Sequence, residues 1–533
     1  MRTVYYNASV YTGSLPLTEA FGVEDGVFFF TGTGKDALSL EADAFVDLKG
    51  AFVCPGFIDS HMHLLNYGQS LTIAPLHRHT GSLEDMLLCL KHTPPGPGGW
   101  ILGRGWNQDL FAEEHRMPDR RDLDKVSADH PVCAVRACGH ALCVNSRALE
   151  LLGITAETLQ PEGGRIVTEN GVPTGIFLDN AMDLIYDAFP LPGKEELKAM
   201  ILAACSDLNA RGITGVHSDD YCAFRALPWQ TVNEAFRELE QEGKLTVRVY
   251  EQANFTDVTA LQAFLDAGNL TGTGIDHFRI GPLKMLGDGA LGARTAFLSR
   301  PYADDPSTRG ISVFSQQEFD DLISLANSRG MQCAIHCIGD ACLDMVLSAL
   351  EKALKDHPRE DHRHGIVHCQ ITRPEQRQRI ADMGLHVYAQ SIFLDYDIHM
   401  VRHRAGNELA RTSYSWKTLK TLGATVSNGS DCPVELPDVL AGIQCAVSRT
   451  DLAGSVPPYL PEEAFTVQEA LDSFTAGGAY ASFEEQRKGK IQPGMLADFV
   501  VLDGDPFRTE ISDICRISIK ETYLCGELVY KKA

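Results

Sequence analysis

The middle of the chain alternates short apolar segments with helical stretches, and this alternation limits the fold more than any other feature of the sequence. Helical segments such as 194–211 and 343–355 separate segments that read as strands. Such an alternation is typical of a parallel sheet, because each helix carries the chain back to the start of the next strand. Eight units predict an α/β fold of the TIM-barrel type, (β/α)8, with its active site at the C-terminal ends of the strands. The expected strands are 55–61, 212–217, 246–250, 278–285, 332–336, 364–368, 386–390 and 424–429.

Both ends of the chain have a different character, with short strands and tight turns. Glu24-Asp25-Gly26 reads as a hairpin turn, and residues 497–502 read as a strand. We therefore expect residues 1–53 and 490–533 to form one composite β-sandwich. Residues 54–489 would then form the barrel.

The interval between the first and second expected strands is far longer than an ordinary connection in a βα unit. It contains the turn-rich segment 94–99 and an apolar run at 132–137. We interpret residues from about 65 to 195 as an inserted subdomain and expect it to cover the barrel mouth, where loops commonly contact substrates.

The overall charge and the cysteines limit the class of protein. A formal net charge of -24 argues against nucleic acid or an anionic membrane as a partner, since both require a cationic surface. The 15 cysteines follow no spacing framework and mostly lie in apolar runs, which is typical of a reducing compartment. The N-terminus has no apolar signal-peptide core, and no apolar run reaches transmembrane length. We expect a cytoplasmic protein.

Polar residues with metal-binding chemistry close several of the expected strands. The first strand ends in a His-x-His pair, whose side chains share one face because strand residues two apart point the same way. A lysine interrupts the apolar fourth strand, histidines end the fifth and sixth strands, and an aspartate follows the eighth. In chain order the set is His61, His63, Lys284, His336, His368 and Asp431.

Imidazole and carboxylate groups together suit zinc and related divalent ions. Such an ion lowers the pKa of water and polarises a carbonyl group, and Asp431 can bind the ion and carry a proton to a leaving amine. A desolvated Lys284 can react with CO₂ to give a carbamate that bridges two metals.

Each of these residues also has a structural interpretation. A single strand-end histidine is more often structural than a ligand, Asp431 can serve as a turn residue before Pro433, and Lys284 can pair with Asp288. It is the joint occurrence of the set that favours a metal site. Cys337, Cys369 and Cys432 directly follow three candidate ligands, but strand alternation turns a neighbour away from the mouth, so we expect buried, inert thiols.

The order HxH, Lys, His, His, Asp resembles that of the amidohydrolase superfamily. Residues 52–63 (FVCPGFIDSHMH) are similar to the opening motif of that family, and residues 489–502 (GKIQPGMLADFVVL) to its closing motif. Residues 136–146 and 284–292 resemble the YtcJ-like amidohydrolase-3 subgroup, which includes N-substituted formamide deformylases. The resemblance covers essentially the whole chain.

This resemblance implies a distorted TIM barrel with a composite β-sandwich and a large insertion after the first strand. It also implies that the six residues bind one or two divalent ions, zinc being the expected metal, with a carbamylated Lys284 if there are two. The implied reaction is hydrolysis of a carbon–nitrogen bond in an N-acyl, N-formyl or cyclic amide. The alternatives are a deaminase of a heterocyclic base and a non-catalytic metal-binding relative. Deaminases of the superfamily usually place a glutamate at the position of Gly339, so this sequence disfavours the deaminase.

Substrate contacts are less well specified by the sequence. His140 and Asn145 lie in the inserted region and either reach the substrate or hold that region together. Trp106 is a candidate for an apolar wall, and Arg294 for an anionic group or for Asp288. His217 ends the second strand and is either a candidate partner of the site or a polar residue without a role in it. The expected partner is a small-molecule substrate, and a homo-oligomer is compatible with the sequence.

Overall fold

The computed structural model describes residues 1–533 except 113–114, 137–140, 162–163, 225 and 533. The chain forms two compact units, each described here by itself. The barrel unit comprises Met1–Leu64, Cys205–Ala223 and Phe236–Ala533, and the inserted unit comprises Leu65–Ala204 and Phe224–Ala235. Among the described residues, no helix combines the length and the apolar character needed to cross a membrane.

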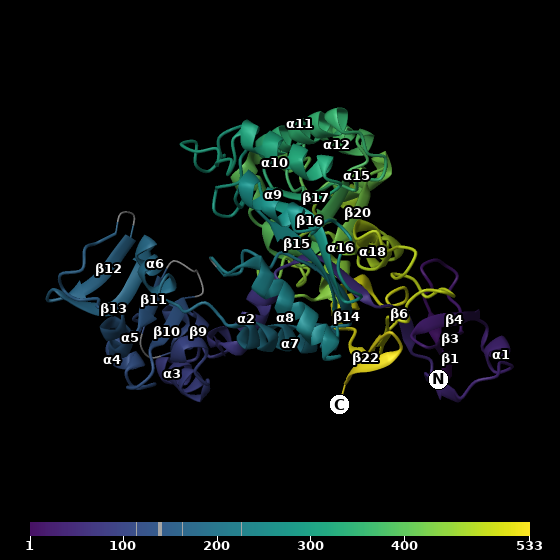
Figure 1. The fold of residues 1–533 in the computed structure, drawn as a ribbon, viewed down its shortest axis with the longest axis horizontal. Helices are drawn as coiled ribbons and strands as arrows, with labels where there is room; N and C mark the ends of the chain where they lie inside the picture. The colour runs from purple at the N-terminus through teal and green to yellow at the C-terminus, as the bar shows by residue number, and fades with distance from the viewer. Residues whose placement is uncertain (113–114, 137–140, 162–163, 225, 533) are drawn as a thin grey trace. The chain divides into compact units, whose positions relative to one another are not determined.

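Eight parallel strands form the barrel, and each one overlaps a strand expected from the sequence (Figure 1). They pair in chain order from the first to the last. The predicted fold class is therefore confirmed. The strands are β7 (Phe57–Met62), β14 (Ile213–Ser218), β15 (Arg248–Asn254), β16 (Phe278–Leu286), β17 (Cys333–Cys337), β18 (Gly365–His368), β19 (His386–Ala389) and β20 (Thr425–Asn428).

The first and last strands of the barrel meet through backbone hydrogen bonds just beyond their C-terminal ends. The backbone N–H of Asp431 donates to the carbonyl oxygen of His61 at 2.8 Å, and that of His63 donates to Cys432 at 2.7 Å. Gly429 permits this approach, because a Cβ there would lie 2.5 Å from the backbone nitrogen of His61. The barrel is thus joined at the end where the candidate ligands lie.

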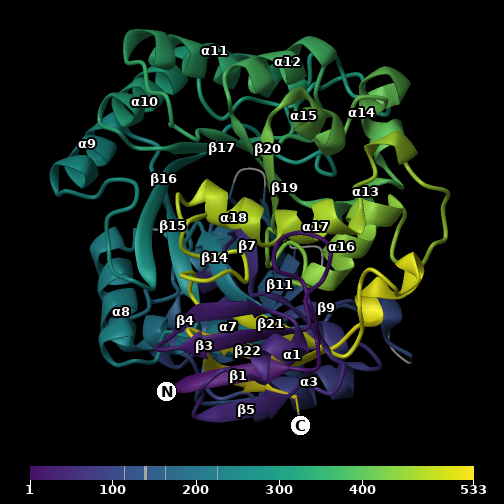
Figure 2. The same cartoon turned by 90° about the vertical axis from the view of Figure 1, so that its right-hand side faces the viewer.

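Helices cover the outside of the strands, as Figure 2 shows for α10, α11, α12 and α15. In α10 (Gln316–Ser328), Ser315 and Glu318 form a capping box, which satisfies N–H groups of the first turn. Its buried residues Phe319, Leu322, Ile323 and Ala326 follow helical spacing and form one apolar face. The other three helices are α11 (Asp340–Asp356), α12 (Pro374–Asp382) and α15 (Trp416–Leu422).

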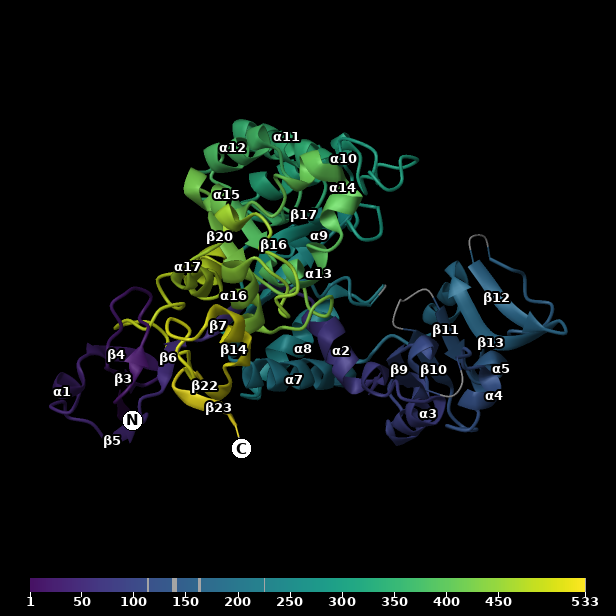
Figure 3. The ribbon, with the colours of Figure 1, turned by 180° about the vertical axis from the view of Figure 1, so that it is seen from behind.

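Strands from both ends of the chain form the expected composite sandwich, visible in Figure 3 where the yellow C-terminal strands lie next to the purple N-terminal ones. Its core joins residues of both ends: the rings of Tyr5 and Phe21 stack at 4.8 Å, and Phe499 packs edge-on against Phe21 at 4.9 Å. One sheet contains β1 (Arg2–Tyr6), β3 (Ala20–Glu24), β4 (Val27–Gly32) and β5 (Ala44–Asp47); the other contains β2 (Ser9–Val10), β6 (Phe52–Pro55), β21 (Phe499–Leu502), β22 (Ile519–Leu524) and β23 (Glu527–Lys531).

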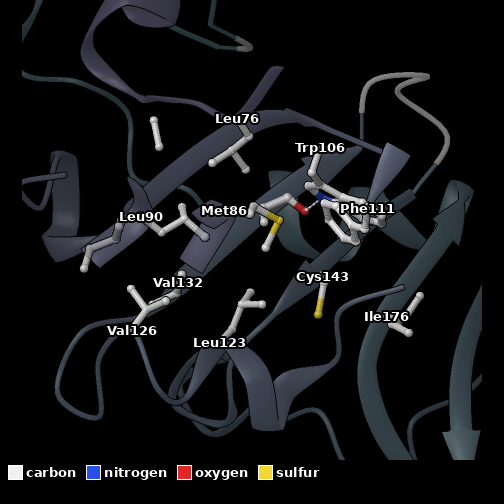
Figure 4. Packing of buried hydrophobic residues seen from close by; sticks show 13 residues of the cluster. Leu76, Met86, Leu90, Trp106, Phe111, Leu123, Val126, Val132, Cys143 and Ile176 are labelled. Atoms are coloured by element: carbon white, nitrogen blue, oxygen red, sulfur yellow. Dashed lines mark hydrogen bonds between the residues drawn. The ribbon is translucent and has the colours of Figure 1, made fainter. Parts of the chain in front are cut away.

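The inserted unit has its own sheet and its own core. Figure 4 shows part of this core, in which the Trp106 indole donates to the carbonyl oxygen of Ala134 at 3.0 Å. The expectation that this region covers the barrel mouth stays a prediction. In order across the sheet the strands are β12 (Gly164–Glu169), β13 (Val172–Asp179), β11 (Ala141–Val144), β10 (Val132–Arg136), β9 (Ile101–Trp106) and β8 (Ala74–Pro75).

Candidate metal centre

His61 and His63 direct one ring nitrogen each at the same carboxylate oxygen. Their Nε2 atoms lie 3.2 and 3.1 Å from Oδ1 of Asp431. On the other side of the rings, Nδ1 of His61 lies 2.8 Å from Oε1 of Gln252, and Nδ1 of His63 lies 3.1 Å from the backbone carbonyl oxygen of Asp219. Both partners are acceptors, so Nδ1 carries the proton and Nε2 keeps the lone pair that a metal requires.

His368 and His336 lie beside this group. Nδ1 of His368 is 2.7 Å from Oε1 of Gln390, and its ring centre lies 5.6 Å from that of His61 and 4.4 Å from that of His336. Nε2 of His336 lies 3.1 Å from the carbonyl oxygen of Gly289. The rings of His61, His368 and His336 therefore form a continuous cluster.

Lys284 is fully buried and pairs with a residue that the sequence did not single out. Its Nζ donates to Oδ2 of Asp219 at 3.3 Å, and neither side chain is exposed. The pairing of Lys284 with Asp288 considered from the sequence is not the one observed. Asp288 instead accepts from the backbone N–H groups of Ile338 and Gly339 at 3.0 and 2.8 Å.

The electrostatics favour neutral His61 and ionised Asp431. Burial and then the charge of Lys284 lower the pKa of His61 to about 4. Burial acts to raise the pKa of Asp431, but its side-chain contacts with Nε2 of His61 and of His63 outweigh this and hold that pKa well below its usual range. A neutral imidazole and a carboxylate are the forms that bind metal ions.

The donor set fits a divalent cation such as zinc. The ligand atoms of His61, His63 and Asp431 all lie within 4.8 Å of one another. Two imidazoles and a carboxylate are typical zinc ligands, and the hydrogen bonds that Gln252 and the Asp219 carbonyl accept orient the rings in the way such sites require. Burial acts to lower the pKa of His63, but the hydrogen bond and charge of Asp431 raise it, so a bound cation would replace a proton at this ring. The remaining candidates, Lys284, His336 and His368, line the same end of the barrel through β16, β17 and β18.

Asp59 supports the two segments that carry the ligands. Its carboxylate accepts from the backbone N–H groups of His61 and Ser430 at 3.2 and 3.0 Å, and from the Ser430 hydroxyl. Burial raises the pKa of Asp59 to about 7. The aspartate of the opening motif thus fixes β7 to the loop that carries Asp431.

The residues considered from the sequence for substrate contact make contacts within the protein where the structure describes them. Asn145 caps α5 (Ser146–Leu151) and is fully buried, with hydrogen bonds to the backbone of its own unit. Trp106 belongs to the core of that unit. Arg294 pairs with Asp304 at 2.8 Å rather than with Asp288. His140 lies outside the described residues.

The sequence singled out His217 at the end of the second strand, and the structure also brings Asp219 to the site, where it contacts His63 and Lys284. The ring of His217 is buried between those of Tyr250 and Tyr388, at 5.0 and 6.1 Å. Asp219 directly follows β14, so the rule that selected the other strand ends also applies to it. Gln252 and Gln390 carry no comparable sequence signal, because a glutamine is not a typical metal ligand.

The structure also describes the cysteines that follow three candidate ligands and the residue next to Gly339. Cys337, Cys369 and Cys432 are all buried, as expected for inert thiols, and burial raises the pKa of each. Asp340, next to the position at which deaminases usually carry a glutamate, accepts from the backbone N–H of Ser299 at 2.8 Å at the start of α11.

Comparison with known proteins identifies the family. A sequence profile described as "Amidohydrolase family" matches residues 44–530. The chain belongs to this amidohydrolase family. It is 35% identical over 545 residues to "Putative amidohydrolase YtcJ" of Bacillus subtilis, with 100% of both chains covered. It is 28% identical to an N-substituted formamide deformylase of Arthrobacter pascens, with 96% of this chain and 95% of the relative covered.

A solved structure agrees with this assignment. A metal-dependent hydrolase of uncharacterised function from Pyrococcus furiosus superimposes with a TM-score of 0.79 at 29% identity, covering 95% of this chain and 100% of the other. The resemblance identified from the sequence is confirmed. The amidohydrolase is thus a hydrolase whose structural neighbours are metal-dependent, and its described residues include a His/Asp group suited to a metal.

Proposed function

We propose that this amidohydrolase cleaves a carbon–nitrogen bond of a small non-peptide amide, such as an N-formyl, N-acyl or cyclic amide. The observation that carries the proposal is the carboxylate of Asp431, which lies within hydrogen-bond distance of Nε2 of both His61 and His63. The relative named N-substituted formamide deformylase, similar over nearly the full length, supports the amide class.

The proposed cofactor is one or two zinc ions. His61, His63 and Asp431 would hold the metal together with His336, His368 and Lys284, and a bound ion supplies Lewis-acid chemistry and activates water at neutral pH. Lys284 would contribute either as a carbamate, if there are two ions, or as the ammonium group that pairs with Asp219. Intact-mass measurement of one added CO₂, absent in Lys284→Met, separates these two forms.

Asp431 is the proton carrier in this proposal. Its low pKa keeps it ionised before the reaction, so an oxygen of the carboxylate can accept the proton of the attacking water. The same oxygen then donates this proton to the nitrogen of the leaving amine. An amine is a poor leaving group unless it is protonated, so this transfer is what a C–N hydrolase requires of its base.

The test combines a substrate panel with one variant. Metal-loaded protein is assayed on N-formyl, N-acyl and cyclic amides and, for comparison, on heterocyclic amines. We expect amide hydrolysis that Asp431→Asn reduces by at least about 100-fold, within the 10²–10⁴-fold range of general acid–base catalysis, while metal analysis shows that most of the metal remains. Normal turnover by Asp431→Asn, or ammonia release from heterocyclic amines without amide cleavage, contradicts the proposal.

A further inference from the structure

A second group of metal-binding side chains lies next to the first and includes a cysteine. The ligand atoms of His63, Asp219 and Cys222 all lie within 4.8 Å of one another. His63 belongs to both groups, since it also contacts Asp431. Cys222 lies just beyond the end of β14, in a turn closed by the hydrogen bond from the backbone N–H of Ala223 to the carbonyl oxygen of Asp220.

The contacts of Asp219 leave one of its oxygens available to this group. Its Oδ2 accepts from Lys284 at 3.3 Å and from Asn254 at 3.1 Å, which holds the carboxylate in place. Its Oδ1 faces Sγ of Cys222 at 3.3 Å, where the thiol donates its proton. The proton shared by sulfur and oxygen therefore occupies the place where a cation would bind both atoms.

Cys222 also differs from the other cysteines of the protein. Among the cysteines that the structure describes, it is the one that is exposed; the others are buried or partly buried. Burial and then the charge of Asp219 raise the pKa of the Cys222 thiol, as burial does for the other cysteines, so what distinguishes Cys222 is its exposure and its two neighbours, an imidazole and a carboxylate.

The geometry points to a second metal position formed by His63, Asp219 and Cys222, which takes a thiophilic divalent cation such as zinc, cobalt or cadmium. On binding, the S–H bond of Cys222 breaks, its proton leaves to solvent, and the sulfur electron pair binds the ion; no atom is oxidised or reduced. Thiolate and imidazole ligands select such ions over magnesium or calcium, which prefer oxygen.

This position also has a consequence for the neighbouring one. A neutral imidazole has a single ring lone pair, so His63 can bind an ion in one of the two groups at a time, and an ion bound to Cys222 competes for His63 with an ion bound to His61 and Asp431. The inference rests on the metal centre of the proposed function, but it concerns a residue outside the ligand set on which that function depends.

Cobalt titration tests the inference without an activity assay. Full-length protein is freed of metal with a chelator and titrated with Co²⁺ alone. We expect the near-ultraviolet charge-transfer band of a thiolate bound to cobalt in the wild type and in Asp431→Asn, and its loss in Cys222→Ser. The matched control is Cys515→Ser, which removes a partly buried free cysteine elsewhere in the barrel unit and is expected to keep the band.

Alkylation provides a second measurement that does not depend on the folding of a variant. Iodoacetamide is added to wild-type protein with and without Cd²⁺, and modification of Cys222 is followed by peptide mass spectrometry. We expect Cd²⁺ to slow this modification. An absent band at saturating cobalt, a band retained by Cys222→Ser, or an unchanged alkylation rate overturns the inference. Amide hydrolysis without the band refutes the inference alone, whereas the band without hydrolysis refutes the proposed function alone.

Discussion

Replacing Gln252 by leucine removes the hydrogen bond that orients His61. Oε1 of Gln252 accepts from Nδ1 of His61 at 2.8 Å, and both side chains are buried. The variant loses a hydrogen bond worth about 0.5–1.5 kcal/mol and leaves a buried ring N–H without an acceptor, at a cost of about 1–3 kcal/mol. Part of that cost is also present in the metal-free protein, so we expect about 1.4–2.8 kcal/mol to appear in metal binding, which corresponds to about 10- to 100-fold weaker affinity.

Metal affinity is measured at pH 7 by competition with a chromophoric chelator. His61 is neutral at this pH, because burial and then Lys284 lower its pKa to about 4, so protonation of the ring does not confuse the comparison. The control is Gln332→Leu, which removes another buried barrel glutamine whose side chain donates to the carbonyl oxygens of Arg363 and Ala481, away from the histidine cluster. We expect this control to lower stability but not metal affinity.

Equal metal affinity of Gln252→Leu and wild type would refute the reasoning, because it would show that His61 needs no support at Nδ1. Equal losses in both glutamine variants would show that the effect is general destabilisation. A restored affinity in Gln252→Glu, which keeps an acceptor oxygen, would support the hydrogen-bond explanation over a packing effect.

Two further predictions concern the backbone and the buried charges of the barrel unit. In Gly429→Ala the new Cβ would lie 2.5 Å from the backbone nitrogen of His61. We therefore expect urea unfolding to show a free energy of unfolding lower by about 1–3 kcal/mol, together with weaker metal binding. The control is Gly215→Ala, where the nearest atom is 3.5 Å away and where we expect no change in stability or in metal affinity. Asp498 forms a buried pair with Arg248 at 2.9 Å; burial acts to raise its pKa, but the charge and hydrogen bond of Arg248 outweigh this and lower it. A carboxyl whose pKa is lower in the folded state stabilises the folded protein at pH values above its pKa in the unfolded chain, about 4. This stabilisation is lost as the pH falls through the folded-state pKa. Asp498→Asn should therefore cost about 3–5 kcal/mol at pH 7 and less below pH 4, and a deficit that does not change with pH would contradict this sign.

The sequence was sufficient to predict the barrel and the candidate ligands but not their partners. The barrel strands are apolar and separated by helices, so each could be recognised from its own residues. Lys284 is an example of what could not be recognised: its partner Asp219 lies 65 residues away in sequence. Only the pairing of β14, β15 and β16 brings these two side chains together.

The sequence left the role of His217 open, and this has a physical cause. Residues 217 and 219 point to the same side of a strand, so alternation alone does not say which of them lies deeper in the barrel. His217 fills the interior between two tyrosine rings, and Asp219 lies at the end of the strand. The contacts of Asn145 and Arg294 could not be predicted for a related reason. Asn145 bonds to backbone groups and Arg294 to the carboxylate of Asp304, and nothing in the sequence marks these groups as neighbours.

The composite sandwich affects the order in which the protein can fold during synthesis. Strand β6 comes almost directly before β7, which carries His61, yet it pairs with β21, which is made near the end of translation. Tyr11 likewise donates to Asp472, a residue 461 positions later. The first strands therefore leave the ribosome long before their partners exist, and their apolar faces stay without a core until then. Because β6 leads directly into β7, the first two candidate ligands reach their final support only when the last strands have been added.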